Sequence, residues 1–451
     1  MTKKLIFLLI TLIGNSASSF SQEKSYSFSL DEAITFALDS NYTALNARRD
    51  IALALKKKWE TTATGLPQIS GNLSYNNNLK QPVTLIPAEF SGGEPGTFTP
   101  VTFGTKQSAN AVATLNQLIF DGSYLVGLQA AKAFLDYSKN VNEKTQLEVR
   151  KGVINAYGGV LLSEELVAIF KKNKENLEKN LYETRKIYEN GLTEEENVEQ
   201  LEITLLEIET NLNNAERMQS IAQQMFNLAL GIDITAPVTL TDKLDTLAEE
   251  NIQLQFMNES LTLEDNIDYK IAYNFTEQRT LEMKLAKSMA LPSLSAFVNY
   301  GTQANSNSFT FLDSDQIWYQ SSILGVSMHI PVFSSGMRGA KTQQAKIALE
   351  QSKTQLEETI QNIKLQFDTA KSNYQFSIDT YQNAKKNLAL AERIENKNQV
   401  KFTEGLSTSF DLRQAQTQLY TAQQSYFQSM VDLINAKTQL ETVLNTPQFN
   451  N

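Results

Sequence analysis

The 451-residue chain has no cysteine and a single histidine, and this excludes several kinds of chemistry. Without cysteine there is no disulfide framework, thiol nucleophile, thiolate-bound metal or lipid anchor on an N-terminal cysteine. One histidine argues against a histidine-rich metal site and against a catalytic triad. The sequence also lacks a phosphate-binding glycine loop and a Gly-x-Ser-x-Gly elbow. We therefore expect no enzyme activity, no catalytic residues, no metal and no cofactor.

Proline and glycine are also scarce, at nine and 19 residues. Together they make up about 6% of the chain, roughly half of average usage, which predicts long elements and few tight turns. The net charge of −10 argues against nucleic acid as a partner. No segment after the N-terminus is a run of 18 or more apolar residues, so a membrane protein of this sequence would have to span with β-strands.

The first 21 residues have the features of a secretory signal peptide. Two lysines precede the apolar stretch Leu5–Ile13, and a small-x-small cleavage site ends at Ser21. This apolar stretch is much shorter than the about 20 residues that cross a bilayer. We therefore expect residues 1–21 to be cleaved and the protein to be exported.

The remaining chain repeats itself once. Gly-Leu-Pro-Gln-Ile-Ser at 65–70 recurs as Ala-Leu-Pro-Ser-Leu-Ser at 290–295. Two later landmarks recur in the same order: 118–122 matches 331–336, and 188–192 matches 402–406. We infer a first repeat over 22–231, a linker over 232–260 and a second repeat over 261–451. The first repeat is longer because of a proline- and glycine-rich insertion within 80–107, which we expect to be a loop.

Each repeat is predicted to contain two strands, at about 66–79 and 108–120 and at about 291–304 and 319–333. Ile69, Leu73 and Tyr75, for example, alternate with serine and asparagine. A membrane β-barrel strand gives this pattern, and so does a half-buried strand of a soluble sheet.

Two proline-free stretches, 122–190 and 336–404, predict very long helices of about 100 Å at 1.5 Å per residue. Shorter helices are predicted at 30–64 and 193–230, and at 262–289 and 407–444. Each short pair, laid end to end, would span one long helix. A repeat thus reads helix, strand, strand, long helix, helix. Because the smallest membrane barrels have about eight strands, several copies must pool their strands, and three copies would supply twelve.

This organisation resembles the TolC family of outer-membrane efflux and secretion channels. The resemblance also rests on the strand-to-helix junctions Phe120–Gly122 and Phe333–Gly336 and on the tip segment Phe402–Leu412. It implies a mostly α-helical homotrimer with a twelve-stranded β-barrel in outer-membrane lipid, continuous with a long α-helical barrel in the periplasm. Residues 232–260 would belong to an equatorial belt. The strands alone, without a lipid anchor, would hold the protein in the membrane.

The implied function is that of a passive exit duct in a tripartite efflux or type I secretion system. Such a duct receives its substrate from an inner-membrane transporter through a periplasmic adaptor protein. The resemblance assigns adaptor docking to the turns between paired helices, at Tyr188, Gly191, Leu192, Thr193, Phe402, Gly405, Leu406 and Ser407.

The resemblance also predicts a periplasmic aperture. Asp411 matches a family carboxylate, Gln414 stands where a second one often lies, and Asn197 and Gln200 are the matching positions of the first repeat. Glutamates 194–196 and 199 cluster there too, where they would also favour a helix N-terminus. Membrane-interface girdles are expected at Trp318, Tyr319, Phe120 and Phe333, with ordinary packing as the alternative reading.

A secreted structural or adhesive coiled-coil protein without a pore is the alternative function. It would be recovered in the soluble fraction. This alternative leaves the alternating strands and the matched helix lengths unexplained.

Overall fold

The computed structural model describes residues 26–446, so the predicted signal peptide lies outside the described residues. The chain forms two compact units, which we treat separately. The sheet unit comprises Asp50–Asn140 and Ile271–Glu358. The hairpin unit comprises the described residues up to Arg49, then Val141–Lys270, and those from Thr359 onward.

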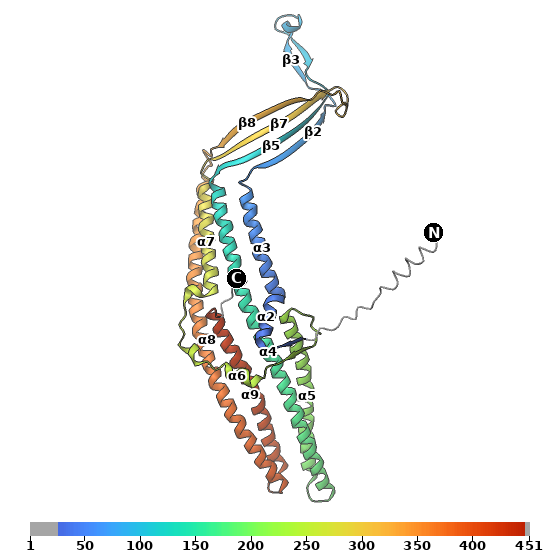
Figure 1. The fold of residues 1–451 in the computed structure, drawn as a ribbon, viewed down its shortest axis with the longest axis vertical. Helices are drawn as coiled ribbons and strands as arrows, with labels where there is room; N and C mark the ends of the chain where they lie inside the picture. The colour runs from blue at the N-terminus through green and yellow to red at the C-terminus, as the bar shows by residue number, and fades with distance from the viewer. Residues whose placement is uncertain (1–25, 447–451) are drawn as a thin grey trace, which may run out of the picture. The chain divides into compact units, whose positions relative to one another are not determined.

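The sheet unit contains a four-stranded antiparallel sheet in the order β2-β5-β7-β8 (Figure 1). The strands are β2 (Gln68–Asn77), β5 (Gln107–Asp121), β7 (Ser293–Ser306) and β8 (Tyr319–His329). β8 ends before the predicted 333, since Pro331 has no N–H to contribute to a ladder. The central pair, β5 and β7, joins the two repeats, while β2 and β8 are edges with no further strand beside them in the sheet.

The strand register separates an apolar face from a polar one. Directly opposed residues of neighbouring antiparallel strands lie on the same face, and Ile69, Leu115, Val298 and Leu324 form one such row. The next row, on the other face, is Ser70, Thr114, Asn299 and Ile323. Asp121 is the only Asp, Glu, Lys or Arg in the four strands, so the polar face consists mainly of hydroxyl and amide groups.

The insertion within 80–107 is not the loop that its composition predicted. It forms a two-stranded antiparallel ribbon of β3 (Val83–Pro87) and β4 (Phe98–Thr102), joined through a 3-10 helix, η1 (Ala88–Ser91). Gly92 and Gly96, with φ of 78° and 82°, provide the left-handed turn conformations. The β-branched and aromatic residues on either side of the glycines are good strand formers, and they pair with one another.

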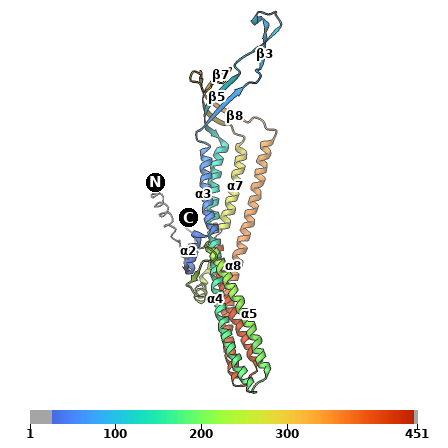
Figure 2. The ribbon, with the colours of Figure 1, turned by 90° about the vertical axis from the view of Figure 1, so that its right-hand side faces the viewer.

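The hairpin unit contains the ends of two long helical hairpins (Figures 1 and 2). The first is α4 (Gly122–Glu189) with α5 (Glu195–Leu230), and the second is α8 (Met337–Thr403) with α9 (Ser409–Val443). Its main core includes the fully buried Tyr157, Phe226, Tyr374 and Met430. The observed order in each repeat confirms the predicted unit of helix, strand, strand, long helix and helix.

The short helices meet end to end through a matching asparagine in each repeat. The predicted helix at 30–64 breaks at Asn41 into α2 (Leu30–Ser40) and α3 (Tyr42–Ala63). The Asn41 Nδ2 donates to the Ala229 carbonyl, near the end of α5, at 2.8 Å. Asn266, which precedes α7 (Ile267–Ser288), donates in the same way to the Val443 carbonyl at the end of α9, at 2.8 Å. Each Oδ1 accepts from the first turn of the helix that follows.

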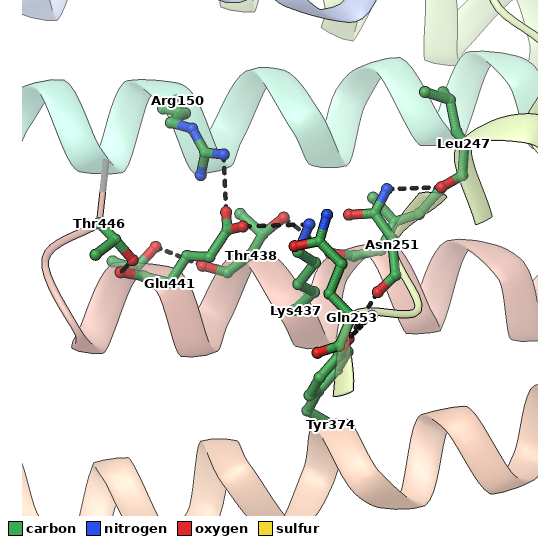
Figure 3. A network of polar contacts seen from close by, with 11 residues as sticks. Arg150, Leu247, Asn251, Gln253, Tyr374, Lys437, Thr438, Glu441 and Thr446 are labelled. Carbon is green, nitrogen blue, oxygen red and sulfur yellow. Dashed lines mark hydrogen bonds and ion pairs between the residues drawn. The ribbon is translucent and has the colours of Figure 1, made fainter. Parts of the chain in front are cut away.

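The linker at 232–260 is hydrogen-bonded to other parts of the hairpin unit near both of its ends. Its strand β6 (Val238–Leu240) pairs in parallel with β1 (Tyr26–Phe28), and α6 (Leu244–Glu250) follows. Two 3-10 helices, η2 (Leu254–Asn258) and η3 (Leu263–Asp265), lead into α7. The Tyr374 hydroxyl donates to the Asn251 carbonyl at 2.7 Å and accepts from the Gln253 N–H at 2.9 Å (Figure 3).

A buried ion pair supports the same region. Arg150 Nη2 of α4 lies 2.8 Å from Glu441 Oε2 of α9, and Lys437 Nζ lies 3.4 Å from Oε1 of the same glutamate (Figure 3). Both partners of the shorter contact are largely buried, with side-chain exposures of 16% and 11%. The pair therefore fastens the two hairpins to each other beside the linker.

Among the described residues, α4 has one 18-residue window long and apolar enough to cross a membrane by composition. Of this window, 44% is buried inside the protein. Val153, Tyr157 and Val160 of α4 have no exposed surface and belong to the main core of the hairpin unit. Packing within the protein therefore accounts for part of the apolar character of this helix.

Candidate functional site at the hairpin turns

The turns of the two hairpins are built alike and lie side by side (Figures 1 and 2). Gly191 and Gly405 both adopt the left-handed conformation, each with φ of 73°. The following leucine N–H then reaches back to the helix, from Leu192 to the Ile187 carbonyl at 3.1 Å and from Leu406 to the Lys401 carbonyl at 2.7 Å. Leu192 and Leu406 are each 78% exposed. Both turns thus present the same Gly-Leu pair to the surroundings.

A cavity of about 780 Å³ lies between the two turns. It brings together predicted docking and aperture residues of both repeats, namely Leu192, Thr193, Asn197, Gln200, Phe402, Gly405 and Ser407. The Asn197 side chain donates to Thr193 Oγ1 at 2.8 Å, and Gln200 Nε2 donates to a Glu196 oxygen at 3.2 Å. Tyr188, Gly191, Leu406, Asp411 and Gln414 do not line this cavity.

Glutamates in the first turn of α5 have the position that favours a helix N-terminus. Glu194 is the N-cap residue without a side-chain cap bond, and Glu195 and Glu196 follow in the first turn. Negative charge there interacts favourably with the unpaired N–H groups of the helix end.

Asp411 forms a capping box with Thr408 at the start of α9. The Asp411 N–H donates to Thr408 Oγ1, and the Thr408 N–H donates to Asp411 Oδ2, each at 3.1 Å. The Thr408 hydroxyl donates to the same carboxylate oxygen at 2.7 Å. These bonds from Thr408 hold the pKa of Asp411 below its ordinary value. An exposed, ionised carboxylate is thus fixed in position close to the second turn, and the Thr-x-x-Asp pattern was a sequence signal for it.

Gln414 lies on a different surface from the turn cavity. It lines a groove of about 1190 Å³ between α8 and α9, with Phe410, Arg413 and Gln418. The Arg413 guanidinium lies over the Phe410 ring, 5.8 Å from its centre.

Sequence reasoning missed two amide pairs that join the two hairpins. Asn173 Nδ2 of α4 donates to Gln423 Oε1 of α9 at 3.0 Å, and both residues are buried. Asn180 and Gln399 exchange two hydrogen bonds, at 3.0 and 3.1 Å. Asparagine and glutamine at inward positions of otherwise apolar helical stripes were the available signal.

The predicted girdle residues lie at opposite ends of the sheet. Phe120 is opposite Leu294, and Tyr319 is opposite Gln303. These two rows lie nine positions apart on β7, about 30 Å along the strand at ~3.4 Å per residue. Tyr319 belongs to the row of Gln303 and hence to the polar face, whereas Phe120 belongs to the apolar one. Phe333 follows β8 and is exposed.

Trp318 belongs to an aromatic cluster that the sequence did not reveal. Its ring lies 6.5 Å from that of Phe311, which in turn lies 5.7 Å from Tyr75 and from Phe309. The segment between β7 and β8 thereby folds across the outermost rows of the apolar face as far as β2. Within residues 26–446, no group of three or more His, Cys, Asp or Glu side chains is placed to hold a metal ion.

Comparison with known proteins finds similarity to outer-membrane efflux and secretion proteins. Residues 272–446 match the family described as outer membrane efflux protein. The chain is 22% identical over 349 residues to the outer membrane protein TolC of Vibrio cholerae, which covers 75% of this chain and 76% of TolC. It is 22% identical over 351 residues to the alkaline protease secretion protein AprF of Pseudomonas aeruginosa, covering 72% and 67% of the two chains.

The fold also matches a solved structure across nearly the whole chain. The outer membrane protein VceC of Vibrio cholerae superimposes with a TM-score of 0.70 at 15% identity, covering 92% of this chain and 96% of VceC. The duplicated fold, the family match and the two relatives agree. Its residues 272–446 thus match the family of outer membrane efflux proteins, and the chain as a whole resembles TolC and AprF in sequence and VceC in fold.

Proposed function

We propose that the protein is an outer-membrane exit duct of a tripartite efflux or type I secretion system. The observation that carries this proposal is the four-stranded sheet, which is apolar on one face, polar on the other and unpaired at both edges. A duct needs these properties if its strands face lipid outside and water inside. The relatives named for efflux and for protease secretion support the same role.

Closure of the sheet requires further copies. The edge strands β2 and β8 are 10 and 11 residues long, and long unpaired edges pair readily with another strand. Apolar side chains on these strands are exposed, at 78% for Leu73 and Leu324. Three copies, with β8 of one paired to β2 of the next, would give a closed barrel of twelve strands with an aqueous lumen. The polar face would line that lumen and the apolar face would contact lipid.

The two hairpin turns are the proposed docking site for the periplasmic adaptor. Their equal backbone geometry and their equally exposed leucines present two similar surfaces from each copy. A repeating partner could engage both turns by one mode of contact. The duct itself does no chemistry, and the inner-membrane transporter supplies the energy.

Asp411, Asn197, Gln200 and Gln414 are the proposed aperture residues. In a three-copy assembly, Asp411 would form a ring of three carboxylates. Like charges in such a ring repel each other and favour passage of cations. The capping box keeps Asp411 ionised and holds its direction.

Single-channel recording in planar lipid bilayers tests this function. We expect discrete conductance steps from the membrane-extracted protein, and a lower cation preference in Asp411→Asn, which keeps an acceptor for the Thr408 N–H. Asp411→Ala should change the conductance further, because it also removes the cap. Asp432→Ala, at an exposed position of the same helix, is the matched control and should conduct as the parent does.

Absence of steps in the parent and in all variants would overturn the open-pore mechanism. Recovery of the protein as a soluble rod would instead favour the secreted coiled-coil alternative.

A further inference from the structure

The ribbon formed by β3 and β4 is a built element with an uncovered apolar face. Its ladder places Val83 opposite Thr102, Leu85 opposite Pro100 and Pro87 opposite Phe98 on one side. On that side Val83, Leu85 and Phe98 are 57%, 63% and 65% exposed. The neighbouring Phe90 and Phe103 are exposed as well, at 84% and 63%. Two strands without a layer packed on them are marginally stable in water, so this face favours a partner.

The ribbon's chemistry narrows the choice of partner. Residues 81–105 contain no lysine or arginine, and their only charged groups are Glu89 and Glu94. An anionic lipid surface is bound through clustered lysine and arginine, so it is not the partner. Pro87 and Pro100 lack N–H groups, which hinders the addition of another strand to the ribbon. The partner therefore contacts the apolar side chains rather than the backbone edge.

The position of the ribbon in the sheet points to a second copy of the same chain. The ribbon follows β2, one free edge of the sheet, and the segment 307–318 precedes β8, the other free edge. The segment leading to the ribbon leaves the sheet after Asn77, and the 307–318 segment leaves it after Ser306. Asn77 and Ser306 lie in the same row of the sheet, because both are opposite Gln107. Pairing of β8 with β2 of a neighbouring copy therefore places one copy's 307–318 segment next to the other copy's ribbon.

The 307–318 segment carries no lysine or arginine and two exposed aspartates, Asp313 and Asp315, and it also exposes three large apolar side chains. Phe309, Leu312 and Ile317 are 60%, 87% and 62% exposed. Because the paired edges already hold the copies together, the local concentration of this surface is far higher than that of any free protein.

We propose that the ribbon of each copy, residues 83–102, docks its apolar face on the 307–318 segment of the neighbouring copy. The three contacts would form a collar beyond the end of the sheet and stabilise the assembly there. This inference rests on the three-copy duct proposed above and adds a second interface between its copies.

Cross-linking tests the collar, because the chain has no cysteine of its own. The variant Leu85→Cys with Leu312→Cys is extracted from membranes and treated with a short bis-maleimide. We expect covalent dimers and trimers on denaturing gels. The matched control, Thr84→Cys with Leu312→Cys, moves the thiol to the opposite face of the same strand and should give several-fold less covalent trimer. Native mass of each sample gives the number of copies.

Each outcome decides the proposal. Covalent trimer from the Leu85 pair and much less from the Thr84 pair supports it. A cross-link confined to single chains overturns it, as does a three-copy assembly without any cross-link, and both leave the proposed duct intact. An assembly of another size overturns the collar and the three-copy duct together.

A second variant tests the energetic role of the same face. Leu85→Ser with Phe98→Ser should lower the temperature at which the extracted assembly separates into monomers, while Thr84→Ser should not. An unchanged separation temperature would contradict a stabilising collar.

Discussion

Replacing Asn266 by alanine should loosen the junction between α9 and α7. Asn266 is 3% exposed, and its side chain makes three hydrogen bonds, one across the junction and two within the start of α7. Its Nδ2 donates to the Val443 carbonyl at 2.8 Å. Its Oδ1 accepts from the Asp268 N–H at 3.0 Å and from the Tyr269 N–H at 3.2 Å. The one side chain thus caps α7 and satisfies the end of α9.

The free-energy cost follows from these contacts. Loss of an asparagine cap costs about 1 kcal/mol. Leaving a buried carbonyl without a donor costs about 1–3 kcal/mol. Together they amount to about 2–4 kcal/mol, and 2 kcal/mol corresponds to about a 30-fold change in an opening equilibrium.

Amide hydrogen exchange measures this opening directly. In Asn266→Ala, amides in the first turn of α7 and the last turn of α9 should exchange about 30-fold faster or more, given the cost above. Asn266→Asp keeps the Oδ1 acceptor of both N–H bonds and loses only the Nδ2 donor, so it should show a smaller effect on α7. Asn396→Ala removes an amide that bonds one turn back on exposed α8 surface and serves as the control. Equal exchange in Asn266→Ala and Asn396→Ala would refute the assigned role of the junction.

Three further changes test other parts of the structure. Glu441→Ala leaves Arg150 buried without its partner and should lower stability by about 3–5 kcal/mol, seen as a lower thermal unfolding temperature; an unchanged temperature would contradict the role of the ion pair. Gly405→Ala puts a side chain at φ of 73° and should cost about 1 kcal/mol, read as faster exchange in the second turn, with exposed Gly339→Ala, inside α8, as the control. Burial raises the pKa of Glu395 above its ordinary value of 4.5. The folded state therefore binds this proton more tightly than the unfolded state does, and the stability of the fold decreases as the pH rises above 4.5 towards the raised pKa. Glu395→Gln should therefore raise the unfolding temperature at pH 7 and leave it unchanged near pH 4, and an equal change at both pH values would contradict this.

Helices and strands with a regular spacing of apolar residues could be predicted from the sequence. Alternation at Ile69, Leu73 and Tyr75 requires only that neighbouring residues face opposite ways, so the apolar face followed directly. The long helices followed from the absence of proline, and the duplication from the order of matching segments. These features depend on short-range information.

Contacts between distant segments could not be read in this way. Asn266 and Val443 are 177 positions apart, and the pairing of Asn180 with Gln399 joins different hairpins. Each depends on how helices from separate parts of the chain pack. The ribbon was missed for another reason, because its glycine and proline content outweighed the strand-forming residues at 83–86 and 98–101.

The positions of the two hairpin turns could be predicted, whereas the roles of their residues remain proposals. The turns at Gly191 and Gly405 were located by their glycines, and the cavity between them collects seven of the predicted residues. The pattern Thr-x-x-Asp at 408–411 indicates the helix cap that Asp411 provides. The family resemblance concerns only the charge of Asp411. A shift of one residue in the strand pairing would move Tyr319 to the other face of the sheet, and composition does not determine this register.

The number of copies in the membrane-extracted assembly tests the central claim most directly, because one sheet of four strands cannot close alone. Native mass spectrometry of the detergent-solubilised protein measures it. The account predicts a single species of three copies. A monomer, or an assembly of any other number of copies, would contradict it.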